Sequence, residues 1–231
     1  MNPLPVPRRL TDFSTDAVAL APRLLGKFLC RRLADGTVLR RRITETEAYF
    51  GEEDTACHAH KGRTPRTDVL YAAGGCAYIY LCYGMHELFN VVAGPEGHPE
   101  AVLIRGVEGA KGPGRLTKLL HITRALNRER LATSARLWLE DDGFAPKYVR
   151  TPRIGIAYAS ARDRLRKWRF VSKDADEAPS SPKMKEGSHD CILRGGHGLQ
   201  MTDFSRRQDA GGSVAATGRD DGCVVPAQEI F

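Results

Sequence analysis

A two-residue turn, Asp35-Gly36, is the feature that most constrains the fold of this chain. The segments on either side of it, Lys27–Leu33 and Thr37–Tyr49, are both strand-like. Aspartate followed by glycine tolerates the left-handed backbone of a tight hairpin turn, so the second segment is predicted to return antiparallel to the first. The fold is therefore expected to open with a β-hairpin whose second strand is long.

A side-chain period of two along that second strand gathers apolar and acidic residues on one face. The predicted face carries Leu39, Ile43, Glu45, Glu47 and Tyr49. A carboxylate among apolar groups is either a general base or a strand carboxylate paired with an arginine, and spacing alone favours the ion pair. Glu47 is the first candidate for a base, and Glu45 on the same face is its competitor.

A second hairpin is predicted where Ala77–Tyr83 and Leu88–Ala93 flank a turn at Gly84-Met85. The tyrosines inside its first strand fit ordinary sheet packing. Tyr83 stands beside the turn, where an aromatic side chain is hard to explain as core and suits a wedge between stacked bases. The tip of this hairpin is therefore the first indication of nucleic acid binding.

The remaining predicted elements are short. A helix is expected from Thr15 to Leu25, capped by Ser14, ended by Gly26 and interrupted by Pro22. A second helix opens at Gly112-Pro113-Gly114-Arg115 and runs to about Ile122, and strands are expected at Ala101–Val107, Arg136–Glu140 and Arg153–Tyr158, with Trp168-Arg169-Phe170 closing the folded body. The length of 231 residues favours one domain with an appendage.

Charge divides the chain into two parts. Residues 171–231 carry 7 Lys and Arg against 10 Asp and Glu, which leaves 28 against 18 in residues 1–170. A basic body suits a polyanion such as the DNA backbone, although many basic proteins bind no nucleic acid. Because residues 171–231 contain few large apolar side chains, they are predicted to form an acidic, disordered tail outside a domain of residues 1–170.

Cysteine spacing and hydropathy exclude several classes of protein. The six cysteines form no CxxC pair, and neither a signal segment nor an apolar run of roughly 20 residues is present. We therefore expect a soluble protein with reduced thiols that is neither secreted nor bound to a membrane. Its expected location is the cytoplasm, in association with the nucleoid, or the nucleus. Zinc is not expected, because the spacing of the candidate ligands matches no common pattern: Cys57, His58, His60, Cys82 and His86.

An ordered set of motifs between residues 14 and 170 adds to this interpretation. It comprises Leu24-Leu25-Gly26-Lys27, Ile43-Thr44-Glu45-Thr46-Glu47-Ala48-Tyr49, Asp54, His58, Tyr80-Leu81-Cys82-Tyr83-Gly84-Met85, Asn90, Leu103-Ile104-Arg105-Gly106-Val107-Glu108, Gly112-Pro113-Gly114-Arg115-Leu116 and Pro152-Arg153-Ile154-Gly155-Ile156. Together these motifs resemble the alkyladenine (3-methyladenine) DNA glycosylase family. The resemblance implies a single mixed α+β domain with a curved, mainly antiparallel sheet, flanking helices and a protruding β-hairpin that enters DNA.

The resemblance also implies roles for particular residues. Glu47 matches the base that activates water, and Arg105 matches the arginine that helps to position that water. The pocket for the flipped base would contain Tyr49, His58, Tyr80 and Asn90, of which Asn90 would disfavour guanine by crowding its exocyclic amino group. Tyr83 would fill the vacated stack, and the other residues expected to contact DNA are Gly84, Met85, Lys61, Thr64 and Arg66.

The function implied is a monofunctional DNA glycosylase that acts as a monomer, without metal or cofactor. It would flip alkylated, and also deaminated, purines out of duplex DNA and hydrolyse the N-glycosidic bond, leaving an abasic site without strand cleavage. Two alternatives stay open: a non-catalytic module that binds damaged DNA or structured RNA, and a metal-linked Cys/His protein. The joint presence of Glu47 and Arg105 favours the hydrolase, because binding phosphate requires neither.

Overall fold

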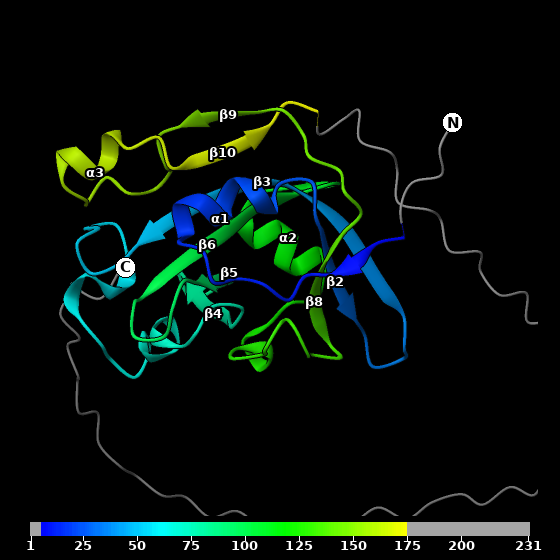
Figure 1. Cartoon of the computed structure of the whole chain (residues 1–231). Coiled ribbons are helices and arrows are strands. Elements are labelled where there is room, and N and C mark those ends of the chain that lie inside the picture. The colour runs from blue at the N-terminus through cyan, green and yellow to red at the C-terminus, as the bar shows by residue number, and fades with distance from the viewer. Residues whose placement is uncertain (1–5, 175–231) are drawn as a thin grey trace, which may run out of the picture. The chain divides into compact units, whose positions relative to one another are not determined.

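Strand β3 (Val38–Phe50) organises the fold, because its two halves pair with different neighbours. Its first half pairs antiparallel with β2 (Phe28–Arg32) across the turn at Asp35-Gly36, which confirms the predicted first hairpin. Its second half pairs with β6 (Glu100–Val107) along one edge and, at residues 45–47, with β10 (Arg169–Ser172) along the other. The computed structural model describes residues 6–174 (Figure 1), so β10 runs two residues past the predicted domain boundary at residue 170, and the tail from residue 175 onward lies outside the described residues.

The sheet has the strand order β1-β8-β2-β3-β6-β5-β4, and its neighbouring strands pair antiparallel. Three strands lie off this path: β10 pairs with β3, β9 pairs with β10, and β7 pairs with β6. The bounds of the strands not yet given are β1 (Arg8–Arg9), β4 (Ala77–Cys82), β5 (His86–Ala93), β7 (Ala110–Lys111), β8 (Leu137–Asp141) and β9 (Tyr148–Thr151). The prediction of a mixed fold built on a mainly antiparallel sheet is confirmed.

Two helices pack against the central strands (Figure 1). Helix α1 (Ala17–Leu24) lies on β3 and β6, and α2 (Pro113–Leu119) lies on β5 and β6. Their buried leucines share one core cluster with residues from one face of the sheet: Ile79, Val91, Val102, Ile104 and Ala48. The other helices are α3 (Ala161–Leu165) and the 3-10 turns η1 (His58–Lys61), η2 (Asp68–Tyr71) and η3 (Arg124–Leu126), and none of the described helices could span a membrane.

The predicted face of β3 is wrong over the first half of the strand. The pairing of β3 with β6 shifts register between Ile43 and Glu45 and again between Glu45 and Thr46. Such a bulge reverses the alternation of side chains. Ile43 therefore belongs to the core cluster beneath α1, with Leu39 packed against it, whereas Tyr49 packs in a second cluster on the opposite side of the sheet.

The predicted cap of α1 is also wrong. The helix begins after Asp16, whose side chain accepts a hydrogen bond from the Ala19 N–H at 2.8 Å. Ser14 instead donates from its hydroxyl to Asp12 at 2.7 Å. A carboxylate at this position satisfies one of the free N–H groups of the first turn, and Glu100 satisfies that of Ala17 at 2.6 Å.

The strand predicted at Arg153–Tyr158 does not form. This segment consists of bends and turns, and the strand lies just before it, as β9. The Ile154 N–H donates to Oε1 of Glu47, so a side chain rather than a neighbouring strand uses this backbone group, and the Arg153 guanidinium binds Asp54. The apolar pattern alone could not reveal these distant partners.

We predict that Asp16→Ala lowers the free energy of unfolding by about 1 kcal/mol, because the Ala19 N–H loses its side-chain acceptor. The matched control Ser14→Ala should change it by less than about 0.5 kcal/mol. Urea unfolding followed by circular dichroism measures both. Equal losses in the two variants would contradict the assignment of Asp16 as the cap.

Candidate active site

An open pocket lies on the face of the sheet opposite α1 and α2. It encloses about 360 Å³ of empty space, part of which is open to solvent. The lining residues come from β3, β4, β5, β6, η1, η2 and the loops around them: Tyr49, Ala56, Cys57, His58, Leu70, Tyr78, Tyr80, Asn90, Ala101 and Tyr158. The four residues predicted to bind a base, Tyr49, His58, Tyr80 and Asn90, are therefore brought together.

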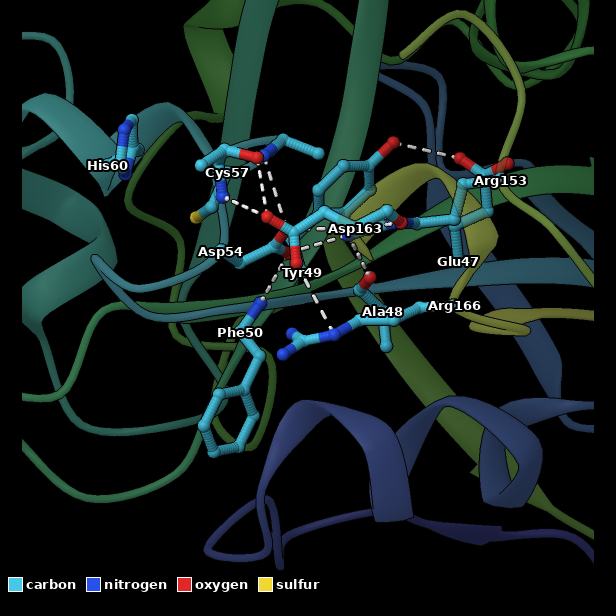
Figure 2. Close-up of polar contacts among 12 residues, drawn as sticks. Glu47, Ala48, Tyr49, Phe50, Asp54, Cys57, His60, Arg153, Asp163 and Arg166 are labelled. Carbon is cyan, nitrogen blue, oxygen red and sulfur yellow. Dashed lines mark hydrogen bonds and ion pairs between the residues drawn. The ribbon is translucent and has the colours of Figure 1, made fainter. Parts of the chain in front are cut away.

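A cross-strand row places Glu47 on this same face. Asn90 lies opposite Tyr78 on one side and Leu103 on the other. Leu103 in turn lies opposite Glu47. Directly opposed residues of antiparallel strands project their side chains to one face of a sheet, so the row runs from the pocket to the carboxylate. Tyr49, two residues after Glu47, lines the pocket and donates from its hydroxyl to Oε2 of Glu47 at 2.9 Å (Figure 2).

The carboxylate of Glu47 is fully buried and held by three donors. Its Oε1 accepts from the Ile154 N–H at 2.8 Å, and its Oε2 accepts from Tyr49 and from Nη1 of Arg105 at 3.3 Å. Burial raises the pKa of Glu47, and the Arg105 charge, the Ile154 amide and the Tyr49 hydroxyl oppose that rise. The three donors favour the ionised form of the carboxylate, whereas burial raises its affinity for a proton. A carboxylate in this environment can accept a proton effectively.

Arg105 joins the two acidic residues that competed for the role of base. Its Nε donates to Glu45 at 3.1 Å, and its Nη1 donates to Glu47. Glu45 also accepts from Nε of Arg169 at 2.6 Å, and its side chain is 15% exposed against 0% for Glu47. Two arginines therefore pair with Glu45, whereas the fully buried Glu47 pairs with Arg105 alone. The predicted ion pair is present as well, because Glu47 is itself paired with Arg105.

Half of the residues that line the pocket carry aromatic rings. The His58 ring lies edge-on to Tyr80, with centroids 4.6 Å apart, and its Nδ1 lies 2.9 Å from the Tyr78 hydroxyl. Asn90 is buried and donates from Nδ2 to the Tyr78 carbonyl at 3.1 Å. Burial and the nearby Arg66 cation lower the pKa of His58 to about 4. The imidazole is therefore neutral at pH 7, and it adds no positive charge to the pocket.

The tip of the β4–β5 hairpin carries two exposed apolar side chains. Tyr83 is 66% exposed and Met85 is 71% exposed, with Gly84 between them. Tyr83 adopts a left-handed backbone with φ of 50°, a conformation that is uncommon outside glycine and that turns the chain sharply here. The second predicted hairpin is confirmed, and its tip presents an aromatic side chain to solvent.

The segment before η2 supplies the other residues predicted to contact DNA. The guanidinium of Arg66 lies over the Tyr80 ring, 5.3 Å from its centroid, and so reaches a residue of the pocket wall. Lys61 and Thr64 are exposed on the same segment. The structure thus links Arg66 to the pocket and leaves the roles of Lys61 and Thr64 as predictions.

Two of the residues that suggested a metal, Cys57 and His60, make other contacts. The Cys57 thiol donates to the Pro99 carbonyl, and burial raises its pKa to about 12. Nδ1 of His60 lies 2.7 Å from the carbonyl oxygen of Glu52. Within residues 6–174, no three His, Cys, Asp or Glu side chains are grouped so that they could hold a metal ion.

Several residues that shape the site were not predicted from the sequence. Tyr158 lines the pocket and donates from its hydroxyl to the Ala56 carbonyl at 3.0 Å. Arg153 and Asp54 form an ion pair whose side chains are both fully buried. Asp54 and the segment around Arg153 were part of the motif set without a role of their own. A signal for Arg153 was its charge at the start of an otherwise apolar segment.

Comparison with known proteins gives one consistent family. A family model for methylpurine-DNA glycosylase (MPG) matches residues 11–111 and 107–176. A protein of Psychrobacter cryohalolentis is 44% identical over 176 residues, covering 64% of this chain and 83% of the relative. Relatives from Methanocella arvoryzae, 44% identical over 190 residues (74% of this chain, 93% of the relative), and Myxococcus xanthus, 42% over 187 residues (75% and 95%), match similarly. All three bear the name "Putative 3-methyladenine DNA glycosylase".

We predict that His58 titrates with a midpoint of about pH 4 in the folded protein. Because this folded-state pKa lies below the unfolded value of about 6.5, the unfolded chain takes up the proton first, and His58 makes the protein less stable as pH falls between those values. Side-chain NMR across pH 3–8, with the resonance assigned by His58→Gln, measures the midpoint. A midpoint near 6.5 would contradict a buried, neutral ring.

Proposed function

The chain belongs to the methylpurine-DNA glycosylase family, and we propose that it hydrolyses the N-glycosidic bond of alkylated purines flipped out of duplex DNA. Membership makes it a DNA glycosylase, a hydrolase of base excision repair whose substrate is DNA. The main support for this proposal is the buried carboxylate of Glu47, which accepts a hydrogen bond from a tyrosine that lines an aromatic pocket.

Access to the bond requires the base to leave the stack. Extruding a paired base costs a few kcal/mol, which an enzyme offsets by filling the gap and by binding the flipped base. Tyr83, exposed at the hairpin tip, would fill the gap from the minor groove, with Gly84 and Met85 beside it. Arg66, Lys61 and Thr64 would contact the phosphates near the pocket mouth.

Selection of the damaged base would rest on charge and shape. Purines alkylated at N3 or N7 carry a positive charge, so stacking on the faces of Tyr49 and Tyr80 gains a cation–π contribution of roughly 0.5–2 kcal/mol over a neutral base. A neutral His58 avoids repelling such a base. Asn90, buried in the pocket wall, would crowd the exocyclic amino group of guanine.

Hydrolysis needs a water molecule held between Glu47 and the sugar. The water oxygen forms a bond to C1′, the C1′–N bond breaks, and its electron pair leaves with the base. The water proton passes to Glu47, while Arg105 orients the water and the carboxylate. Because an alkylated purine departs as a neutral molecule, it needs no acid on the protein. Deaminated purines are neutral before departure, so we propose that they leave more slowly.

The product would be an abasic site in an intact strand. Strand cleavage by a glycosylase requires an amine nucleophile, and none of the described residues that line the pocket is a lysine. The reaction as proposed uses no metal or cofactor. It also uses no second copy of the chain, and it takes place on the DNA of the nucleoid or nucleus.

We predict that Glu47→Gln lowers base release from alkylated duplex DNA by about 10²–10⁴-fold, because the variant cannot accept the water proton. Free base is measured by chromatography under single-turnover conditions without added metal, and DNA affinity should be unchanged. Glu45→Gln is the matched control and should retain most of the wild-type rate. If wild type binds the DNA tightly but releases no base, the chain is a binding module.

We predict that Tyr83→Ala lowers the single-turnover rate about tenfold, since losing the side chain that fills the stack removes on the order of 1.4 kcal/mol from the flipped state. Tyr148→Ala, at a tyrosine that is 38% exposed on β9, is the control. Fluorescence of a base analogue paired with the lesion follows flipping directly. Equal effects of the two substitutions would contradict a wedge at Tyr83.

A further inference from the structure

A buried ion pair lies beside the candidate base (Figure 2), and neither of its two residues lines the pocket. Arg153 donates from Nη1 to Oδ2 of Asp54 at 2.6 Å and from Nη2 to Oδ1 at 2.8 Å. Both side chains are 0% exposed. Removing two charges from water costs several kcal/mol per ion, and apolar replacements of such pairs are often as stable. Stability alone is therefore a weak explanation for this pair.

Three contacts of the pair lie at Tyr49 or at its two neighbours in sequence. Arg153 donates to the Ala48 carbonyl at 2.8 Å, and Asp54 accepts from the Phe50 N–H at 3.1 Å, so the pair holds the backbone on both sides of Tyr49. The guanidinium also lies over the Tyr49 ring, 4.8 Å from its centroid. Tyr49 is consequently fixed in the direction that its hydroxyl needs in order to reach Glu47.

The same pair fixes a second donor to the base. Ile154 directly follows Arg153, and its N–H donates to Oε1 of Glu47 at 2.8 Å. This loop has no strand partner to hold that amide in place. Anchoring the Arg153 side chain in Asp54 therefore determines where the Ile154 amide points. Two of the three donors on Glu47 depend on one ion pair.

We propose that Asp54 and Arg153 are positioning residues that set the ionisation and orientation of Glu47 by fixing the Tyr49 hydroxyl and the Ile154 amide. The role in catalysis rests on the proposed function, whereas the effect on the Glu47 carboxyl does not. The positive charge of Arg153 also favours the ionised form of Glu47 and lowers its pKa against the effect of burial.

The molecule offers a matched pair as a control. Arg42 and Asp142 form another two-bond ion pair, at 2.7 and 3.1 Å, with side chains 4% exposed. Arg42 lies on β3 five residues before Glu47, and its pair has no contact with Tyr49 or Ile154 among the bonds of the described residues. A purely structural role would make the two pairs equivalent.

The test compares Asp54→Asn/Arg153→Gln with Arg42→Gln/Asp142→Asn, because replacing both partners leaves no unpaired buried charge. Carbon-13 NMR of labelled glutamate, assigned with Glu47→Gln, follows the titration of Glu47. Single-turnover base release is measured from pH 5 to 9. We expect the titration midpoint of Glu47 to rise by about one pH unit in the Asp54/Arg153 variant. The acid limb of the rate profile should move by the same amount, which makes the rate at a given pH on that limb about tenfold lower. The control should shift neither, at a similar loss of thermal stability.

Each remaining outcome decides the question. Unchanged titration in the Asp54/Arg153 variant, or an equal shift in the control, overturns the positioning role. If wild type releases no base, the proposed function fails, and the NMR titration still judges the positioning of Glu47. If the double variant does not fold, Arg153→Lys against Arg42→Lys replaces it, with a shift expected in the first alone.

Discussion

The burial of the Glu47 carboxylate is the constraint on which the rest of the site depends. An unpaired carboxylate at 0% exposure would be protonated, because burying its negative charge costs far more free energy than neutralising it with a proton. The fold answers with donors from three separate places: the Tyr49 hydroxyl on β3, Arg105 on β6 and the Ile154 amide after β9. The site can exist only when these three segments have assembled.

The two faces of the sheet are used differently, and this difference makes that assembly possible. One face of the central strands packs beneath α1 and α2, and the other forms the aromatic pocket. The bulge in β3 separates the two, since Ile43 enters the core while Glu45, Glu47 and Tyr49 remain on the pocket side. A regular strand would have kept Ile43 on the face of the two acids, so the irregularity lets one strand serve both core and site.

Local signals in the sequence predict both hairpins, because turn residues and alternation act over a few positions. Glu47, Tyr49 and Arg105 emerge as candidates from their place on strands and from the family resemblance. The contacts that hold these residues in place join distant parts of the chain: Glu47 and Ile154 are 107 residues apart, and Arg153 and Asp54 are 99 apart. No local pattern encodes such pairs. The bulge arises from the pairing of β3 with β6, and the alternation of residues along β3 alone does not reveal it.

The most direct test of this account is the crystal structure of the Glu47→Gln variant bound to duplex DNA that carries an alkylated purine. We expect the damaged base between Tyr49, His58 and Tyr80, with C1′ facing the substituted side chain and Tyr83 inserted into the vacated stack. A lesion that stays stacked in the duplex, or a flipped base bound away from this pocket, would contradict it.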